Sequence, residues 1–186
     1  MVSRSKIAPE MTSADLTDLL IFIELIRVDV WLDGGWGVDA LLGVQTRAHK
    51  DVDLILRVEN VPKFQQELEK KGFSFKEGCF PHSFVLTNGQ GLEIDIHAVS
   101  TDQDGNGRYQ MQNGEYWIYP AEGFNGKGTI NGKAIRCLSP EAQVLCHAYG
   151  YTPVEKDFKD MEHLQRRFGV KLPPHLRSNL SHTPQF

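Results

Sequence analysis

The feature that most constrains the fold of this chain is a pair of glycines, Gly34 and Gly35, followed sixteen residues later by two aspartates, Asp51 and Asp53. The glycines end a short apolar run that suits a strand. Side chains on an extended strand alternate faces, so the two aspartates point the same way while Val52 and its alternate neighbours point into a core. The sequence therefore predicts a strand, a tight turn, a short helix and a second strand that presents two carboxylates on one face.

This pattern has a chemical consequence. Two carboxylates held side by side repel each other in a folded protein unless a cation lies between them. A hard divalent ion with oxygen ligands, Mg²⁺ above all, suits such a pair. A glycine turn leaves backbone N–H groups open to an anion such as a phosphate. A metal site beside a phosphate-binding turn indicates phosphoryl or nucleotidyl transfer.

A third carboxylate, Asp95, lies in the middle of the alternating segment 92–98. Its polar face also carries Glu93 and His97, and an Asn-Gly turn before it predicts a hairpin. An aspartate in mid-strand is costly unless it is paired or binds a metal. If this strand neighbours the strand of Asp51 and Asp53, three carboxylates converge. Such a set suits a two-metal site with ions about 3.5–4 Å apart, or two metal ligands and one proton acceptor.

Periodicity and capping residues predict the remaining elements. We expect helices over residues 13–27, 36–42, 62–71, 140–149 and 153–168, and strands over 29–32, 50–58, 73–75, 83–87, 92–98, 116–119 and 133–138. The fold class is α+β, a mixed sheet with helices followed by a C-terminal helical part. We divide the chain into a core (1–138), helices that pack on it (139–170) and a loose tail (171–186) without periodicity.

The composition limits the classes of partner and the cell compartment that we expect. The chain has 186 residues and a net charge of −4, so no global basic field attracts nucleic acid. No apolar run approaches the roughly 20 residues that span a bilayer, and no signal peptide is evident. The three cysteines are odd in number and lack metal-ligand spacing, which favours reduced thiols and a cytoplasmic location. Oligomeric state is left open, with a homodimer as one option.

The run from Trp31 to Leu54 resembles the signature of the DNA polymerase β-like nucleotidyltransferases, an apolar residue, Gly-Gly, a spacer and then Asp-apolar-Asp. More narrowly, WLDGGWGVDALLG with the following R.H.DVD resembles lincosamide nucleotidyltransferases and aminoglycoside 2″-adenylyltransferases. The segments LEIDIH and IRCLSPEAQVLCH resemble the lincosamide group. The resemblance covers residues 28–168. The chain departs from the lincosamide pattern in its longer FNGKGTINGKAI segment and in its tail, and the aromatic run 116–119 is unmatched. These differences leave the acceptor open.

The resemblance implies a role for each matching residue. Asp51 and Asp53 are the expected Mg²⁺ ligands, and Asp95 is the expected general base and a further possible metal ligand. Gly34 and Gly35 form the phosphate-binding turn. The cationic or polar residues before the aspartates are expected to reach the triphosphate, although a surface role is an equal alternative: Arg47, His49 and Lys50.

Weaker candidates complete the predicted site. Lys156, on the last helix, is placed to reach the γ-phosphate, and a solvated helix face explains it equally well. The residues expected to touch the acceptor are Glu93 and His97, which flank Asp95, and Tyr149, for which a structural role is the simpler interpretation. We expect Trp36 to pack in the core and Asp39 to hold its loop by hydrogen bonds.

The predicted function is Mg²⁺-dependent transfer of AMP from ATP, or of another nucleotide, to a hydroxyl of a small molecule, with release of pyrophosphate. A lincosamide is the first expected acceptor and an aminoglycoside the second. Protein, RNA and a metabolite are further alternatives, and the acidic net charge disfavours RNA. A non-catalytic nucleotide-binding module is disfavoured because all three aspartates are present.

Overall fold

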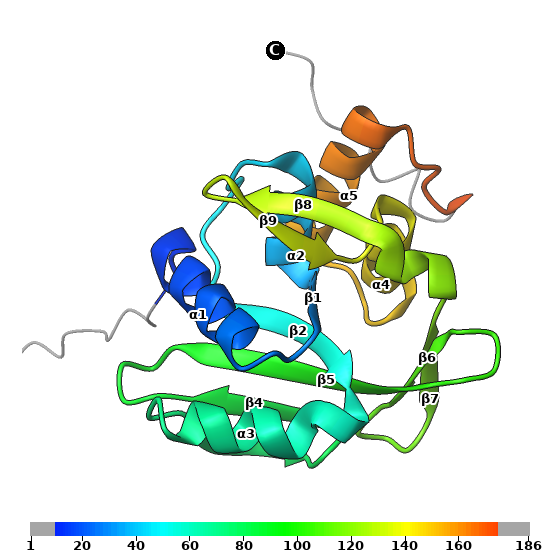
Figure 1. The fold of residues 1–186 in the computed structure, drawn as a ribbon. Helices are drawn as coiled ribbons and strands as arrows, with labels where there is room; N and C mark the ends of the chain where they lie inside the picture. Colours follow the sequence, from blue (N-terminus) through cyan, green and yellow to red (C-terminus); the bar gives the residue numbers. More distant parts are fainter. Residues whose placement is uncertain (1–9, 175–186) are drawn as a thin grey trace, which may run out of the picture.

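The structure, a computed structural model, describes residues 10–174 and has the expected α+β architecture (Figure 1). Its described strands form one mixed sheet of nine strands with the path β3-β4-β5-β2-β1-β9-β8. In that order they are β3 Ser74–Cys79, β4 Ser83–Thr87, β5 Glu93–Thr101, β2 Asp51–Arg57, β1 Val30–Asp33, β9 Lys133–Cys137 and β8 Gly126–Ile130. A hairpin of β6 (Gly107–Gln110) and β7 (Tyr116–Tyr119) pairs with the C-terminal end of β5.

Strand register places three aspartates in one row. β2 pairs antiparallel with β1 and parallel with β5, as the predicted convergence of carboxylates requires. Asp53 lies opposite Asp33 on one side and opposite Asp95 on the other. Because paired residues on neighbouring strands share a sheet face, the three carboxylates point to the same side.

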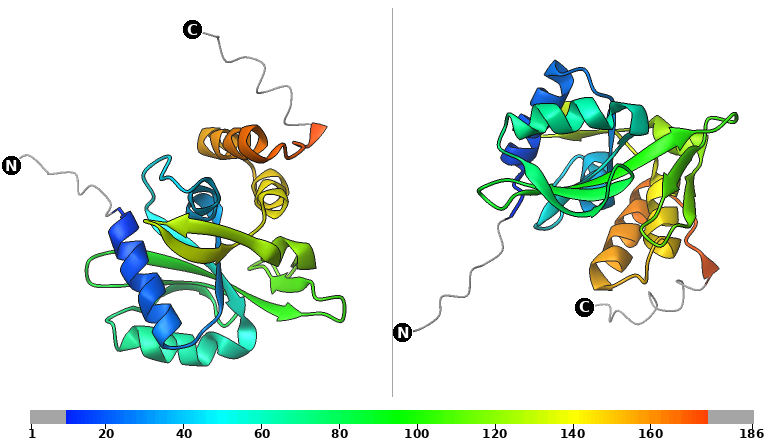
Figure 2. Two further views of the ribbon diagram at one scale, coloured as in Figure 1. Left: turned by 45° about the horizontal axis from the view of Figure 1, so that its top comes forward. Right: turned by 90° about the horizontal axis from the view of Figure 1, so that it is seen from below.

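Helices cover both faces of the sheet (Figures 1 and 2). Helices α1 (Ser13–Leu25) and α3 (Val61–Glu69) bury their apolar stripes against the face opposite the aspartates. Helix α2 (Gly34–Leu42) follows β1 directly, and α4 (Pro140–Tyr149) and α5 (Glu155–Phe168) pack against it. A capping box of Thr12 and Asp15 starts α1.

Several boundaries differ from expectation for physical reasons. α1 ends at Leu25, because Arg27 has a positive φ of 55° that no helix continues. β3 extends to Cys79 rather than residue 75, and it is exposed throughout, so it shows no burial alternation to read. β6 was not expected, because it is a short, glycine-containing strand. β8 forms a hairpin with β9 through the Asn131-Gly132 turn. Two short 3₁₀ helices, η1 (Val58–Asn60) and η2 (Ala121–Asn125), also connect the strands.

The C-terminal helices share a second apolar cluster with α2, formed by Val38, Val144, Met161, Leu164 and Leu172 among others. Leu172 is 1% exposed, so the first part of the predicted tail is packed rather than loose. From residue 175 that predicted tail lies outside the described residues. The division into a core and a helical part at 138/139 stays a prediction. Within residues 10–174 no helix combines the length and apolarity needed to cross a bilayer.

Candidate active site

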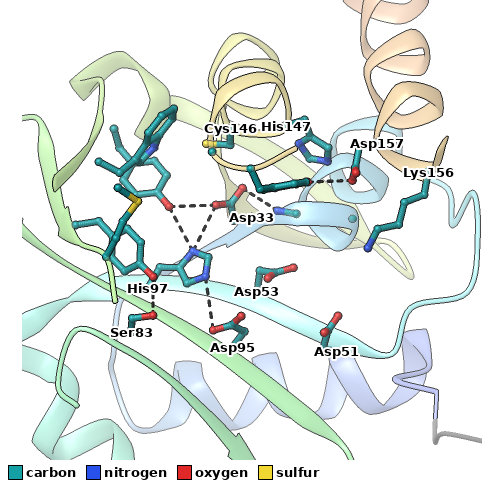
Figure 3. A pocket seen from close by; sticks show the side chains of 18 of the residues that line it. Asp33, Asp51, Asp53, Ser83, Asp95, His97, Cys146, His147, Lys156 and Asp157 are labelled. Carbon is teal, nitrogen blue, oxygen red and sulfur yellow. Dashed lines mark hydrogen bonds and ion pairs between the residues drawn. The ribbon is translucent and has the colours of Figure 1, made fainter. Parts of the chain in front are cut away.

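A pocket of about 420 Å³ lies over the row of aspartates, between the sheet, the β6–β7 hairpin and the C-terminal helices (Figure 3). It brings together most of the residues that the sequence singles out. Those that line it are Gly34, Gly35, Arg47, Asp51, Asp53, Asp95, His97 and Lys156. Three other candidates, Lys50, Glu93 and Tyr149, and the buried His49 are not among its lining residues.

Asp53 stands at the centre of this negative charge. Burial raises the pKa of Asp53 to about 7, and the charges of Asp95, Asp51 and Asp33 add to that rise while His97 opposes it. Ionised carboxylates are therefore costly here without a cation. Carboxylate oxygens of Asp53 and Asp95 and a ring nitrogen of His97 lie within 4.8 Å of one another. Oxygen-rich donors of this kind fit a hard divalent ion. Asp51 lies outside this group of three but lines the same pocket, on the same face of β2 as Asp53.

The glycine turn has two separate reasons for lacking side chains. Asp33 ends β1 and caps α2, accepting the Gly34 N–H at 2.7 Å. Gly34 has φ +57°, and a Cβ there would overlap the Asp53 carboxylate, so only glycine fits. A Cβ on Gly35 would overlap Arg47 and His49 instead. The turn therefore presents the N-terminus of α2 directly beside the carboxylates, where an anion such as phosphate binds well.

His97 occupies the space between two carboxylates (Figure 3). Its Nδ1 lies 3.8 Å from Asp33 and its Nε2 lies 3.6 Å from Asp95. The Tyr119 hydroxyl lies 3.3 Å from Nδ1 and donates to Asp33 at 3.4 Å. Burial works to lower the pKa of His97, but its contacts with Asp33 and Asp95 raise it well above the ordinary value. The imidazolium thus offsets part of the negative charge of the row.

Comparison with known proteins identifies the family. A model of the aminoglycoside-2″-adenylyltransferase family matches residues 15–164. The chain belongs to this family. It is 32% identical over 155 residues to a lincosamide resistance protein of Staphylococcus haemolyticus, covering 83% of this chain and 95% of the relative. It is 28% identical over 123 residues to a 2″-aminoglycoside nucleotidyltransferase of Klebsiella pneumoniae, covering 66% of this chain and 65% of that protein.

Solved structures of lincosamide and aminoglycoside adenylyltransferases resemble this chain as well. The lincosamide antibiotic adenylyltransferase LnuA, bound to lincomycin, superposes with a TM-score of 0.73 at 31% identity, over 84% of this chain and 98% of that one. ANT(2″)-Ia, in complex with adenylyl-2″-tobramycin, has the same fold with a TM-score of 0.69 at 22% identity, over 91% and 96% of the two chains. The predicted superfamily and polymerase β-like fold are confirmed, and this member of the family is a nucleotidyltransferase.

Of the residues before the aspartates, Arg47 lines the pocket, whereas His49 is buried beneath it. In this nucleotidyltransferase His49 is buried, stacks on Trp36 with ring centroids 4.4 Å apart, and holds Asp39 at 2.6 Å. Because Arg47 Nη1 can only donate to His49 Nδ1, Nε2 carries the hydrogen that Asp39 accepts. Asp39 also accepts from the backbone and hydroxyl of Thr46. His49 therefore holds the loop rather than facing a triphosphate, and the expectations for Asp39 and Trp36 are confirmed.

Arg47 joins this loop to the C-terminal helices. Its Nη2 lies 2.8 Å from Asp160 Oδ2, and its Nε donates to the same carboxylate at 3.4 Å. Burial works to raise the pKa of Asp160, but hydrogen bonds with His147 and Arg47 hold it below the ordinary value. The pair thus stays ionised and ties the segment before β2 to α5.

Lys156 lies in the first turn of α5 and lines the pocket on the side facing the carboxylates (Figure 3). Across residues 10–174 it makes no hydrogen bond or ion pair, unlike Arg47. It is therefore a cation still available to a ligand. Its placement depends on α5, which the Arg47–Asp160 pair secures.

Two residues that were predicted to contact the acceptor, Glu93 and Tyr149, do not line the pocket. Glu93 pairs with Lys76 at 2.7 Å. Tyr149 is 53% exposed and borders a separate surface hollow on the far side of α4. The tyrosine that does line the pocket is Tyr151, which donates to Asp157 at 2.9 Å. It follows the end of α4, where helical periodicity no longer indicates the direction of a side chain.

Further lining residues escaped the sequence interpretation. They are Asp33, Ser83, Tyr109, Met111, Gln112, Trp117, Tyr119, Cys146, His147, Gly150, Tyr151 and Asp157. Asp33 had a readable signal, a strand-ending aspartate directly before a helix N-terminus. His147, Asp157 and Asp160 also cluster closely enough to suit a cation. Their main polar atoms are already engaged, however: Asp157 accepts from Tyr151 and the Val154 N–H, and Asp160 binds Arg47.

The Arg47–Asp160 pair yields a stability prediction. Arg47→Ala removes the shorter of the two ionic contacts of Asp160, whose side chain is 2% exposed, and leaves the contact with His147 at 3.7 Å. We expect the free energy of unfolding at pH 7 to fall by about 1–3 kcal/mol, because a buried carboxylate that loses a charged partner is costly and Arg47 is itself partly exposed. Adding Asp160→Asn should recover part of the loss. Urea unfolding measures both.

The control for this experiment is Lys70→Ala, which removes an exposed pair with Glu67. It should change stability by less than about 0.5 kcal/mol. An Arg47→Ala protein that unfolds at the same urea concentration as the unaltered protein would contradict the structural role of the pair.

Proposed function

We propose that this protein is a Mg²⁺-dependent adenylyltransferase that moves AMP from ATP to a hydroxyl of a small-molecule acceptor and releases pyrophosphate. The observation that carries the proposal is the in-register row of Asp33, Asp53 and Asp95 beside the Gly34 turn. Such a row needs a cation, and the turn offers N–H groups to an anion. A nucleoside triphosphate with its metal ion supplies both.

Asp51 and Asp53 would hold the ion, and Asp95 lies close enough to share it. When bound, Mg²⁺ neutralises phosphate charge and polarises the phosphorus that is attacked. The backbone of the glycine turn and the Lys156 ammonium bind the triphosphate. Asp95 accepts the proton of the acceptor hydroxyl, whose oxygen forms a bond to the α-phosphorus as the bond to pyrophosphate breaks. Other nucleoside triphosphates remain alternative donors.

A lincosamide is the acceptor we favour, with resistance by adenylylation as the biological role. The lincosamide resistance protein is the relative with 32% identity, and LnuA was solved with lincomycin. The acceptor side of the pocket supports this, because Tyr109, Trp117 and Tyr119 provide a largely aromatic wall. An aromatic wall suits the apolar flank of a lincosamide.

An aminoglycoside is the second candidate, because the matching family model carries that substrate in its name. Protein, RNA and a metabolite are the remaining alternatives, and the net charge of −4 disfavours RNA. A non-catalytic module is disfavoured because the carboxylate row is complete. Cytoplasmic location and a homodimer stay predictions.

The proposed function is tested by incubating the protein with MgATP and a panel of lincosamides and aminoglycosides, then measuring acceptor mass. We expect one AMP to be added to a lincosamide. Asp53→Asn should lower the rate at least about 10²-fold, because it weakens the metal site. Asp104→Asn, on an exposed loop away from the pocket, is the matched control and should keep full activity. No adduct on any acceptor, or an active Asp53→Asn protein, would overturn the proposal.

Lys156 provides a second prediction. Lys156→Ala should raise KM for MgATP by about 10–100-fold, the worth of a charge-assisted contact to phosphate, and change acceptor KM much less. Lys159→Ala is the control one turn away, since Lys159 pairs with exposed Glu155. Steady-state kinetics with each substrate varied in turn gives both constants. Equal KM values for MgATP in the two variants would show that Lys156 does not bind the nucleotide.

A further inference from the structure

His97 is held on several sides. Its ring stacks on Tyr109 with centroids 5.0 Å apart, and Tyr109 is itself anchored by donating to Ser83 at 2.7 Å. Tyr119 and Asp33 both face Nδ1. The side chain is 20% exposed. These contacts come from β1, β4, β6 and β7, so the ring has little freedom to turn.

The immobilised ring directs its Nε2 at Asp95. The separation from Asp95 Oδ1 is 3.6 Å, and both residues lie on one face of β5, two positions apart. In the part of the chain that the structure describes, His97 is the only side chain in hydrogen-bond or ion-pair contact with Asp95. Asp95 is also 35% exposed, so its carboxylate is not held by close packing. Among the described residues, the contact with His97 is the one that limits its rotation.

We infer that His97 is a positioning residue for Asp95: it holds Oδ1 and thereby leaves Oδ2 oriented toward the acceptor hydroxyl. The inference rests on the proposed role of Asp95 as the proton acceptor. Proton transfer needs the base within hydrogen-bond reach of the hydroxyl, and small misplacements of a reacting group lower rates steeply. Partners of this kind typically change activity by about 10–100-fold when removed.

The contacts of His97 extend this role to the phosphate turn. Asp33, which faces Nδ1, also caps α2 and fixes the Gly34 N–H. One chain of contacts therefore runs from the glycine turn through Asp33 and His97 to Asp95. It sets the position of the base relative to the phosphate-binding backbone, which a residue contacting only the acceptor would not do.

A double-mutant cycle tests the inference by single-turnover rate at saturating MgATP and acceptor. The variants are His97→Phe, Asp95→Asn and the double variant. Phe keeps the ring that stacks on Tyr109 and removes both nitrogens. We expect His97→Phe alone to slow the reaction about 10–100-fold at saturating MgATP. In the Asp95→Asn background the same substitution should cost little, because residues that act as a unit are not additive.

Two further variants keep the test decisive. His97→Gln places an amide nitrogen near the Nε2 position and should restore most of the rate. His82→Phe, the same substitution on a nearby histidine that does not line the pocket, should leave the rate unchanged. If His97→Phe does not fold, as judged by its melting curve, the cycle is run with His97→Leu.

The outcomes separate the two claims. A full effect of the His97 substitution in the Asp95→Asn background, or a Gln variant as slow as the Phe variant, would overturn the positioning role. A raised acceptor KM with an unchanged rate would instead show direct contact with the acceptor and also overturn it. An Asp95→Asn protein with a normal rate would refute the base itself, and with it the proposed chemistry.

Discussion

The mutual repulsion of three aspartates held in register is the constraint on which the rest of the structure depends. Asp33, Asp53 and Asp95 sit on neighbouring strands whose other faces form the main core, so they cannot move apart without breaking the sheet. The positive end of α2 and the ring of His97 offset part of this charge. A divalent cation would offset the remainder, which is why we place the proposed metal site in this row.

The C-terminal helices supply a lysine side chain, which the sheet side of the pocket lacks. The sheet and its glycine turn hold the carboxylates and the N-terminus of α2, while α5 brings the Lys156 ammonium to the opposite side of the pocket. Arg47 secures that arrangement by binding Asp160 across the two parts. The β6–β7 hairpin closes the remaining side with aromatic rings, one of which steadies His97. Nucleotide and acceptor would thus meet between elements distant in sequence.

Much of this could be predicted from the sequence, because the key signals are local. The Gly-Gly turn, the alternating aspartates and the strand of Asp95 follow from short-range periodicity, and their convergence needed only the strand pairing that the structure shows. The roles of His49 and Arg47 could not be predicted, since their partners come from α2 and from α5, 113 residues away in the case of Arg47. Likewise, which tyrosine lines the pocket depends on how α4 ends.

The most direct test of the account is a crystal structure of the protein with Mg²⁺ and a non-hydrolysable ATP analogue. The account predicts an ion bound by oxygens of Asp51 and Asp53, with the triphosphate against the backbone of Gly34 and Gly35. An ion held instead by His147, Asp157 and Asp160, or a triphosphate bound away from the glycine turn with the three aspartates uncoordinated, would contradict it.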